Sequence, residues 1–466
     1  NSRRSWTRQP EKLVDAGSSQ AGRQARTTFQ YGKLHPSASP TPHLRMFISP
    51  IGGVIRKLNQ VPTKKILPAR TAPLRVKFVL TSLPVGGAET LLLNLISRLD
   101  RQAFQAEVVC LKEPGQLGID VSQLVPVHSH LLNSKWDLRV LPRLVKLFRE
   151  SKTDVVVTVG AGDKMFWGRL AAYFAKVPVV CSALHSTGWP DGVGRMNRWL
   201  TSVTDGFIAC AASHAKFLVD FERFPKEHVF TIPNGIDTSR FRPDAPQRDW
   251  LRTELGVASD ARLVGIVAAL RSEKNHLQFV EAATQVIRNR ANTHFVIIGE
   301  GPERASIEKA IEATSQKSHF HLLGNRHDTE RCLAALDVFC LTSKNEANPV
   351  SILEALACEV PVVAPNVGSI SETVINGKTG LLTSPMESSS TAAEQMGRSG
   401  RQLVAESSSL ERMVQGYETL WEQLYNAKAA IHQSAPWKRP PANSAASPNL
   451  GLHEVLPSQP DVALFH

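Results

Sequence analysis

Short apolar runs alternate with longer amphipathic stretches through most of this 466-residue chain. Runs such as Asp154–Val159 are continuous rather than alternating, which is typical of strands buried on both faces of a parallel sheet. Helical periodicity between them predicts helical crossovers and an α/β fold. We predict strands at Val76–Leu80, Glu107–Leu111, Asp154–Val159, Val177–Cys181, Gly206–Ala209, Val229–Ile232, Leu263–Ala268, His294–Ile298, Phe320–Leu322, Asp337–Leu341 and Pro361–Ala364.

The strand–helix pattern restarts near Asn234–Arg242, a turn-rich stretch. This break predicts two Rossmann-like domains, with a ligand between them beyond the carboxyl ends of the strands. The predicted divisions are a basic disordered tail at 1–73, a first domain at 74–233, a second at 234–409, a helix at 410–428 that crosses back, and a disordered tail at 429–466.

The net charge of +12 is confined to the leading segment, since residues 1–77 alone carry 15 Lys and Arg against two acids. The remaining residues sum to −1, so the body of the chain gives no reason to expect nucleic acid as a partner. The leading segment either makes a peripheral contact with an anionic membrane surface or results from a mis-assigned start of translation. The six cysteines are scattered without a CxxC pair, which predicts reduced core residues of a cytoplasmic protein.

The most informative stretch is Leu341–Pro365. A strand is followed by a loop with Glu346, and then by a helix that begins near Pro349 and contains Glu354. Free amides near Val350 and Ser351 are a natural seat for a diphosphate. The two glutamates are eight residues apart, about 12 Å of helical rise, which is too far for a glycosidase-like carboxylate pair. We therefore expect two separate roles for them.

Other strand ends carry further candidates. Arg271 and Lys274 follow a strand, where cations neutralise a departing diphosphate. Gly86 and Gly87 follow the first strand and allow close approach to a phosphate or acceptor. His185 opens a small polar cluster. Taken singly, each has an ordinary structural reading as a surface charge, a tight turn or a core histidine; their ordered appearance at strand ends favours function.

Several motifs together resemble glycosyltransferase family 4, retaining enzymes of the GT-B fold, from about residue 75 to 428. They are GGAE at 86–89, IPNGIDTSRFRP at 232–243, ALRSEKNH at 269–276, VIIGEGPER at 296–304, HLLGNRHD at 321–328, and Glu346 with Glu354 ahead of LEALACEVPVVAP. The resemblance implies an acceptor domain at 74–233, a nucleotide-sugar domain at 234–409, and transfer of a hexose from a UDP- or GDP-sugar to a lipid-linked or polysaccharide acceptor. It implies no metal or other cofactor.

The resemblance also implies roles for single residues. Glu346 would face the transferred sugar and Glu354 the ribose, while Arg271 and Lys274 hold the diphosphate with the amides near Val350 and Ser351. Gly86 and Gly87 would lie beside the phosphates and His185 near the sugar. The base would stack near three further residues: Gly324, Asn325 and Arg326.

The chain departs from the family pattern at three places. Ala269 stands where the family has an arginine, Ala347 where it has a glycine, and the segment after Leu382 is short by about one helix. These departures keep a degenerate nucleotide-sugar-binding module open as an alternative. A GT-B-fold epimerase is a second alternative, while a phosphorylase has no supporting lysine motif.

Overall fold

The computed structural model describes residues 72–134, 137–160, 162–185, 197–383 and 392–434. The chain separates into residues 1–47 and 48–466, and all described residues belong to the second unit. The predicted leading tail is therefore outside the described residues up to position 71, and the trailing tail from position 435.

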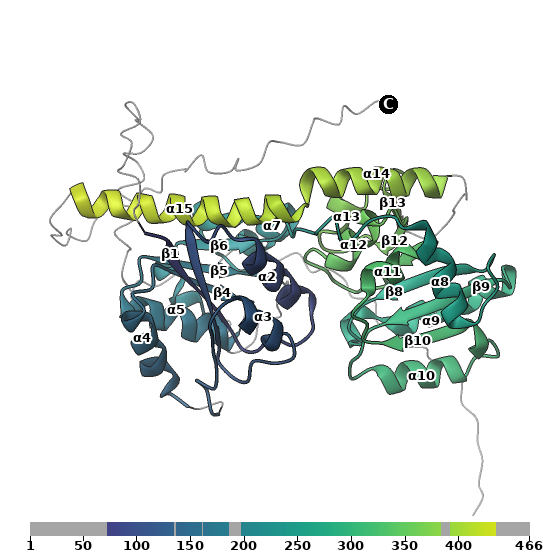
Figure 1. Ribbon diagram of the computed structural model, residues 1–466, viewed down its shortest axis with the longest axis horizontal. Helices are drawn as coiled ribbons and strands as arrows, with labels where there is room; N and C mark the ends of the chain where they lie inside the picture. The colour runs from purple at the N-terminus through teal and green to yellow at the C-terminus, as the bar shows by residue number, and fades with distance from the viewer. Residues whose placement is uncertain (1–71, 135–136, 161, 186–196, 384–391, 435–466) are drawn as a thin grey trace, which may run out of the picture. The chain divides into compact units, whose positions relative to one another are not determined.

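The first sheet has seven parallel strands in the order β3-β2-β1-β4-β5-β6-β7 (Figure 1). Every residue of the inner strands β4 and β5 is buried, as their continuous apolar runs predict. The strands are β1 (Leu74–Leu80), β2 (Phe104–Cys110), β3 (Val127–His128), β4 (Val155–Val159), β5 (Val179–Ala183), β6 (Gly206–Ala209) and β7 (Val229–Thr231).

Helices cover both faces of this sheet because alternate residues of each strand point to opposite sides. Phe78 packs in one core cluster with Leu92, and the next residue, Val79, packs in another with Leu144 and Ala171. The helices are α2 (Gly87–Arg98), α3 (Gly118–Leu124), α4 (Val140–Glu150), α5 (Asp163–Ala175) and α7 (Ala212–Asp220), with 3-10 turns at Thr201–Val203 and Lys226–His228. We call this sheet with its helices the first half.

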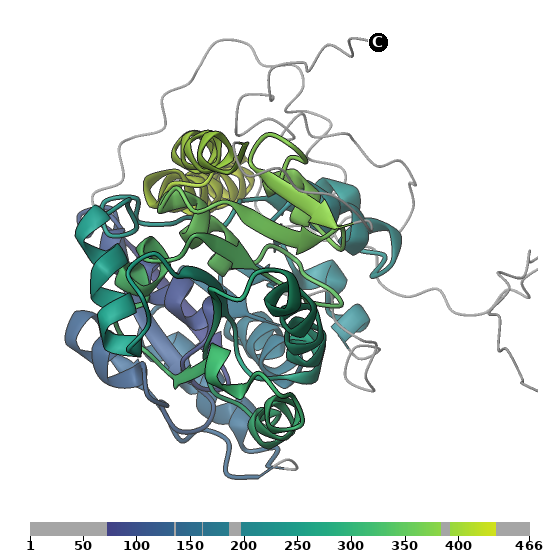
Figure 2. The same cartoon turned by 90° about the vertical axis from the view of Figure 1, so that its right-hand side faces the viewer.

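The second sheet has six parallel strands in the order β10-β9-β8-β11-β12-β13. They are β8 (Arg262–Val267), β9 (Thr293–Ile298), β10 (Phe320–Gly324), β11 (Val338–Cys340), β12 (Val362–Pro365) and β13 (Gly380–Thr383). We call this sheet with its helices the second half; Figure 2 shows its helices around the sheet.

The helices of the second half contribute to a single core cluster with their sheet. They are α8 (Ala245–Leu255), α9 (His276–Asn289), α10 (Arg304–Glu312), α11 (Thr329–Ala334), α12 (Val350–Ala357), α13 (Ile370–Thr373) and α14 (Ala392–Ser407), with 3-10 turns at Ser272–Lys274 and Lys317–His319.

The last helix, α15 (Leu410–Ser434), belongs to the core of the first half (Figure 1). Trp421 is fully buried and makes edge contacts with Phe78 and Phe104, each with ring centroids 5.7 Å apart. The chain thus leaves the first half after β7, builds the second half, and returns.

Two parallel sheets flanked by helices confirm the predicted GT-B class. The sequence analysis missed the short strands β3 and β13 and did not place α14. Between β1 and α2 the chain bends at residues 85 and 86; Gly86 is extended, with φ −165°, and Gly87 already begins α2. All six cysteines are free, as predicted. Among the described residues, no helix is both long and apolar enough to cross a membrane.

Candidate active site

The loop that carries Glu346 joins β11 to α12 and is held from the start of α13. Gly368 has φ +58° and lies so close that a Cβ on it would collide with the backbone oxygen of Glu346. The next residue, Ser369, donates from its backbone N to that same oxygen at 3.2 Å and from Oγ to the oxygen of Ala347. Glycine and serine therefore fix the loop in which the predicted carboxylate sits.

Glu346 and Lys274 form an ion pair at the carboxyl edge of the second sheet. Lys274 Nζ lies 2.5 Å from Glu346 Oε1, and the exposed fractions of the two side chains are 24% and 8%. Thr342 supports the lysine because its Oγ1 donates to the backbone oxygens of Lys274 and Asn275, both at 3.1 Å. The structure thus brings together the two residues for which the sequence predicted the main chemistry.

Arg271 lies on the same segment but is not drawn into the site. Its side chain is 60% exposed, and it is 4.0 Å from the carboxylate of Glu273, an exposed contact worth little. The guanidinium is therefore free to reorient toward a ligand.

The starts of α12 and α2 face each other. Pro349 is the residue before α12, so Val350 and Ser351 form its first turn as predicted. A Cβ on Gly87 would lie 3.5 Å from Cγ2 of Val350. A Cβ on Gly86 would lie 2.5 Å from the carboxylate of Glu89, which is the flexible end of that side chain. Neither glycine has a positive φ, so the backbone conformation does not require glycine at either position.

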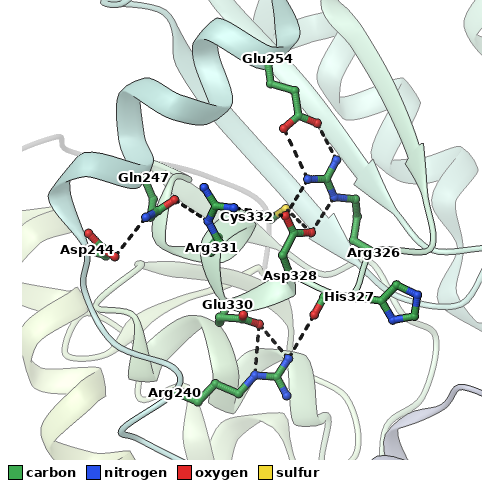
Figure 3. Close-up of polar contacts among 10 residues, drawn as sticks. All are labelled: Arg240, Asp244, Gln247, Glu254, Arg326, His327, Asp328, Glu330, Arg331 and Cys332. Atoms are coloured by element: carbon green, nitrogen blue, oxygen red, sulfur yellow. Dashed lines mark hydrogen bonds and ion pairs between the residues drawn. The ribbon is translucent and has the colours of Figure 1, made fainter.

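Glu354 occupies the second turn of α12 and is partly buried. Burial raises the pKa of its carboxyl to about 7, and the charge of Glu330 adds to the rise while Arg240 opposes it. Arg240 is itself engaged by Glu330, with Nε and Nη2 at 3.1 and 2.7 Å from the carboxylate (Figure 3). Glu354 therefore sits beside a cation that another carboxylate already holds.

The predicted base region, Gly324–Arg326, follows β10. Gly324 has φ +65°, and Asn325 is exposed. The Arg326 guanidinium donates to Glu254 at 2.5 Å and to Asp328 at 2.8 Å (Figure 3), and these bonds raise its pKa. The N–H groups of the Arg326 guanidinium are thus already engaged by carboxylates of the second half.

His185 follows β5 in the first half. Burial lowers the pKa of its imidazole to about 4, helped by the nearby His214 and Lys164, while a hydrogen bond with Asn234 opposes this. Asn234 also donates from Nδ2 to the backbone oxygen of Asn348 at 2.9 Å, and Asn348 donates from Nδ2 to that of Cys210 at 2.8 Å. These amides connect the loop of Glu346 to the strand ends of the first half.

Sequence reasoning missed three residues of this region. Asn234 was read as part of a turn, and Asn348 only as a neighbour of Ala347. Glu372 was not considered, although its carboxylate accepts from the backbone N of Ala212 at 2.9 Å and of Ser213 at 2.6 Å, at the start of α7. One signal in the sequence could have pointed to these three residues. Each is a polar residue next to the end of an apolar strand or helix, outside the periodic pattern of that element.

No group of three or more His, Cys, Asp or Glu side chains in the described part of the chain is placed to hold a metal ion. The charged groups that the site does provide are Lys274, Glu346 and Glu354, with Arg271 nearby.

Comparison with known families matches both halves of the chain. The model for "Glycosyl transferases group 1" matches residues 247–414, and the model for "Glycosyltransferase Family 4" matches residues 85–240. The two matches together with the two-sheet fold define a glycosyltransferase of the GT-B class. The chain belongs to the group 1, family 4 glycosyltransferases, within the hexosyltransferase class.

Named relatives are identical to this chain at about a quarter of the aligned residues. The glycosyltransferase EpsF of Bacillus subtilis is 27% identical over 323 residues, 66% of this chain and 83% of EpsF. The UDP-Gal:alpha-D-GlcNAc-diphosphoundecaprenol alpha-1,3-galactosyltransferase of Escherichia coli is 28% identical, over 61% of this chain and 77% of that protein. N-acetyl-alpha-D-glucosaminyl L-malate synthase of Bacillus anthracis is 25% identical, over 54% and 71%.

Solved structures agree on the fold. HepE of Anabaena, in complex with UDP and glucose, superposes with a TM-score of 0.66 at 18% identity, covering 75% of this chain and all of HepE. A glycosyltransferase of Rickettsia africae gives a TM-score of 0.65 at 16% identity, covering 76% and 98%.

Proposed function

We propose that this enzyme transfers a hexose from a UDP- or GDP-sugar to a lipid-linked or polysaccharide acceptor, with retention of configuration and without a metal ion. The proposal rests on one observation: Lys274 and Glu346 form an ion pair at the carboxyl edge of the second sheet, next to the start of α12. The Escherichia coli relative, whose name gives a diphosphoundecaprenol-linked acceptor, supports a lipid-linked acceptor.

Lys274 and Glu346 would bind different parts of the donor, the diphosphate and the hexose. Lys274 and the amides of Val350 and Ser351 would neutralise the diphosphate as it leaves. Glu346 would then exchange its ion pair for hydrogen bonds to the hexose hydroxyls. Glu354 would accept hydrogen bonds from the ribose, and the base would lie against the backbone of Gly324–Arg326.

Retention fits a reaction on one face of the sugar. In such a reaction the departing diphosphate helps to remove the proton of the acceptor hydroxyl, so the protein needs no second carboxylate opposite Glu346. His185, neutral at physiological pH because of its low pKa, would position the sugar and the acceptor. The domain limits at 233 and 409, the cytoplasmic location and the membrane contact of the leading segment stay predictions.

One observation keeps the degenerate binding module in view. Ala269 provides no guanidinium, and Arg271 is exposed rather than held at the site. A binding module would keep nucleotide affinity without turnover.

A thermal-shift panel of the full chain tests the proposal, with UDP, GDP, ADP and their common hexose conjugates as ligands. We expect stabilisation by the UDP or the GDP series, and loss of that stabilisation in Lys274→Met. Donor-only incubation then separates an epimerase, which converts the sugar, from a transferase, which does not. No shift with any nucleotide at millimolar concentration would contradict the proposal, and a shift without transfer would favour the binding module.

A further inference from the structure

Helix α7 of the first half begins with a residue that cannot cap it. The N-cap residue is Ala211, whose backbone is extended, with φ −161° and ψ 161°. Alanine is a poor N-cap residue because its methyl group cannot accept a hydrogen bond from the N–H groups of the first turn. The sequence of α7 therefore leaves these N–H groups to an acceptor from elsewhere in the chain.

The second half supplies this acceptor. Glu372 on α13 accepts from the backbone N of Ala212 through Oε2 at 2.9 Å and from that of Ser213 through Oε1 at 2.6 Å. Both carboxylate oxygens are used, and the negative charge lies at the positive end of the α7 dipole. The two contacts span 160 and 159 positions of the sequence. We call this contact the inter-half cap.

A second side chain of the second half binds the same turn of the first half. Asn348 donates from Nδ2 to the backbone oxygen of Cys210 at 2.8 Å, immediately before the N-cap of α7. The second half thus meets the turn at 210–213 with one donor and two acceptors, which match the polar groups of that turn. Because β6 ends at Ala209, this match holds the second half against the carboxyl edge of the first sheet.

Both contacts lead to the loop that carries Glu346. Asn348 lies in that loop. Glu372 lies on the helix whose N-cap residue, Ser369, donates to the backbone oxygens of Glu346 and Ala347. Since α13 is a single turn of four residues, a shift of Glu372 moves Ser369 with it. The inter-half cap is therefore connected to the predicted carboxylate through one short helix.

We propose that Glu372 is a positioning residue for the transfer, and that its contact with α7 aligns the loop of Glu346 with the half that holds the acceptor. The inference rests on the proposed function, in which Glu346 faces the sugar and the first half binds the acceptor. Loss of the inter-half cap leaves the nucleotide contacts of the second half in place but misaligns the reacting groups. A displacement of about 1 Å at a reacting centre can lower the rate about a hundredfold.

Kinetics separate positioning from binding. Turnover is measured as release of UDP or GDP from the sugar conjugate that stabilises the wild type, with an octyl glycoside as acceptor. We expect Glu372→Ala to lower kcat about ten- to a hundredfold and to change the nucleotide Kd, measured by calorimetry, by no more than about twofold. Glu372→Gln keeps one accepting oxygen and should retain more of kcat.

Glu281→Ala is the matched control, because Glu281 is an exposed glutamate on α9 of the second half, and it should change neither value. An unchanged kcat in Glu372→Ala would overturn the inference and leave the transferase proposal intact. So would a loss of nucleotide affinity as large as the loss of kcat.

A double variant separates positioning from simple helix capping. Ala211→Ser gives α7 a local side-chain acceptor, so adding it to Glu372→Ala should restore the Tm that the loss of the cap lowers. The connection between the halves stays broken, and kcat should stay low. If Ala211→Ser restores kcat together with the Tm, Glu372 acts only as a helix cap and the inference is wrong.

Hydrogen exchange followed by mass spectrometry tests the connection even if no sugar nucleotide is turned over. In Glu372→Ala, the amides of Ala212 and Ser213 should exchange faster, and so should those of the loop at 343–349. Adding Ala211→Ser should restore protection in α7 but not in this loop. Unchanged exchange in the loop in Glu372→Ala would overturn the inference, whatever the result for the transferase proposal.

Discussion

The carboxyl edges of the two sheets differ in how their charges are balanced. In the second half, Lys274 is paired with Glu346, Arg326 with Glu254 and Asp328, and Arg240 with Glu330. At the carboxyl edge of the first sheet, neutral amides make such contacts: Asn348 donates from Nδ2 to the backbone oxygen of Cys210 at 2.8 Å, and His185 forms a hydrogen bond with Asn234. The carboxyl edge of the second sheet, with Lys274 and Glu346, is called the donor edge below. Ion pairs hold its side chains before a ligand binds, so a ligand must displace one of these internal pairs.

Replacing Lys274 should have the largest effect, because it removes the cation from the donor edge and leaves Glu346 buried without its partner. We expect Lys274→Met to lower kcat/KM by about 10²- to 10³-fold, the range for loss of one electrostatic group at a reacting centre. Steady-state transfer kinetics check this.

The exposed Lys344 offers a control, since Lys344→Gln changes the same charge nearby and should leave kcat/KM unchanged. In the double variant with Glu346→Gln, the losses should be less than additive, because the two residues act as a pair. A loss of less than threefold in Lys274→Met would remove the distinction between the two edges.

Glu354 should show an intermediate effect with opposite signs for stability and binding. Its pKa in the folded chain, about 7, is above the usual 4.5, so the folded state holds the proton more tightly than the unfolded state. The free energy of unfolding therefore falls as pH rises from about 4.5 to 7. Glu354→Gln cannot ionise, and it should raise the free energy of unfolding by about 3 kcal/mol at pH 8 but little at pH 4.5.

The same substitution should weaken nucleotide binding about tenfold, because an amide accepts ribose hydrogen bonds less strongly than a carboxylate. Urea unfolding at the two pH values and calorimetry with the nucleotide measure both effects. Glu411→Gln, an exposed glutamate on α15, is the control and should change neither. Equal stability changes at pH 4.5 and 8 would show that Glu354 is ionised freely in the fold.

The smallest effect is expected at Arg271, which is exposed and only loosely paired. Arg271→Gln should raise the donor KM about two- to fivefold, the value of an exposed charge contact. Ala269→Arg should offset this loss in the double variant, because it supplies a guanidinium at the family's usual position. If Arg271→Gln has no effect on the donor KM, Arg271 does not act as a second cation beside Lys274.

The sequence predicted the fold where the pattern was strong. Val155–Val159 and Val179–Ala183 are continuous apolar runs, and each became an inner strand. The pattern failed for Val127–His128, which is only two residues long, and for Gly380–Thr383, whose glycine and threonine weaken the strand signal. For α14 the glycines at 397 and 400 hid a helix. Gly397 is required because a Cβ there would lie 2.0 Å from the backbone oxygen of Glu359.

The site was readable in the second half and poorly readable in the first. Glu346, Lys274 and Val350 lie in motifs with fixed spacing, so pairing between strand ends followed from topology. In the first half, His185 forms a hydrogen bond with Asn234, and Asn234 donates to the backbone oxygen of Asn348. These residues lie far apart in the sequence, and no motif spacing connects them.

The return of α15 to the first half has a consequence for synthesis on the ribosome. Because Trp421 fills the core between Phe78 and Phe104, a nascent chain that has finished β7 still lacks part of that core. The core of the first half must remain incomplete while almost 180 further residues are translated and the second half folds. The second half is therefore the first unit able to fold to completion, although it is made later, and a truncated gene ending after β7 should yield an aggregating fragment rather than an independent domain.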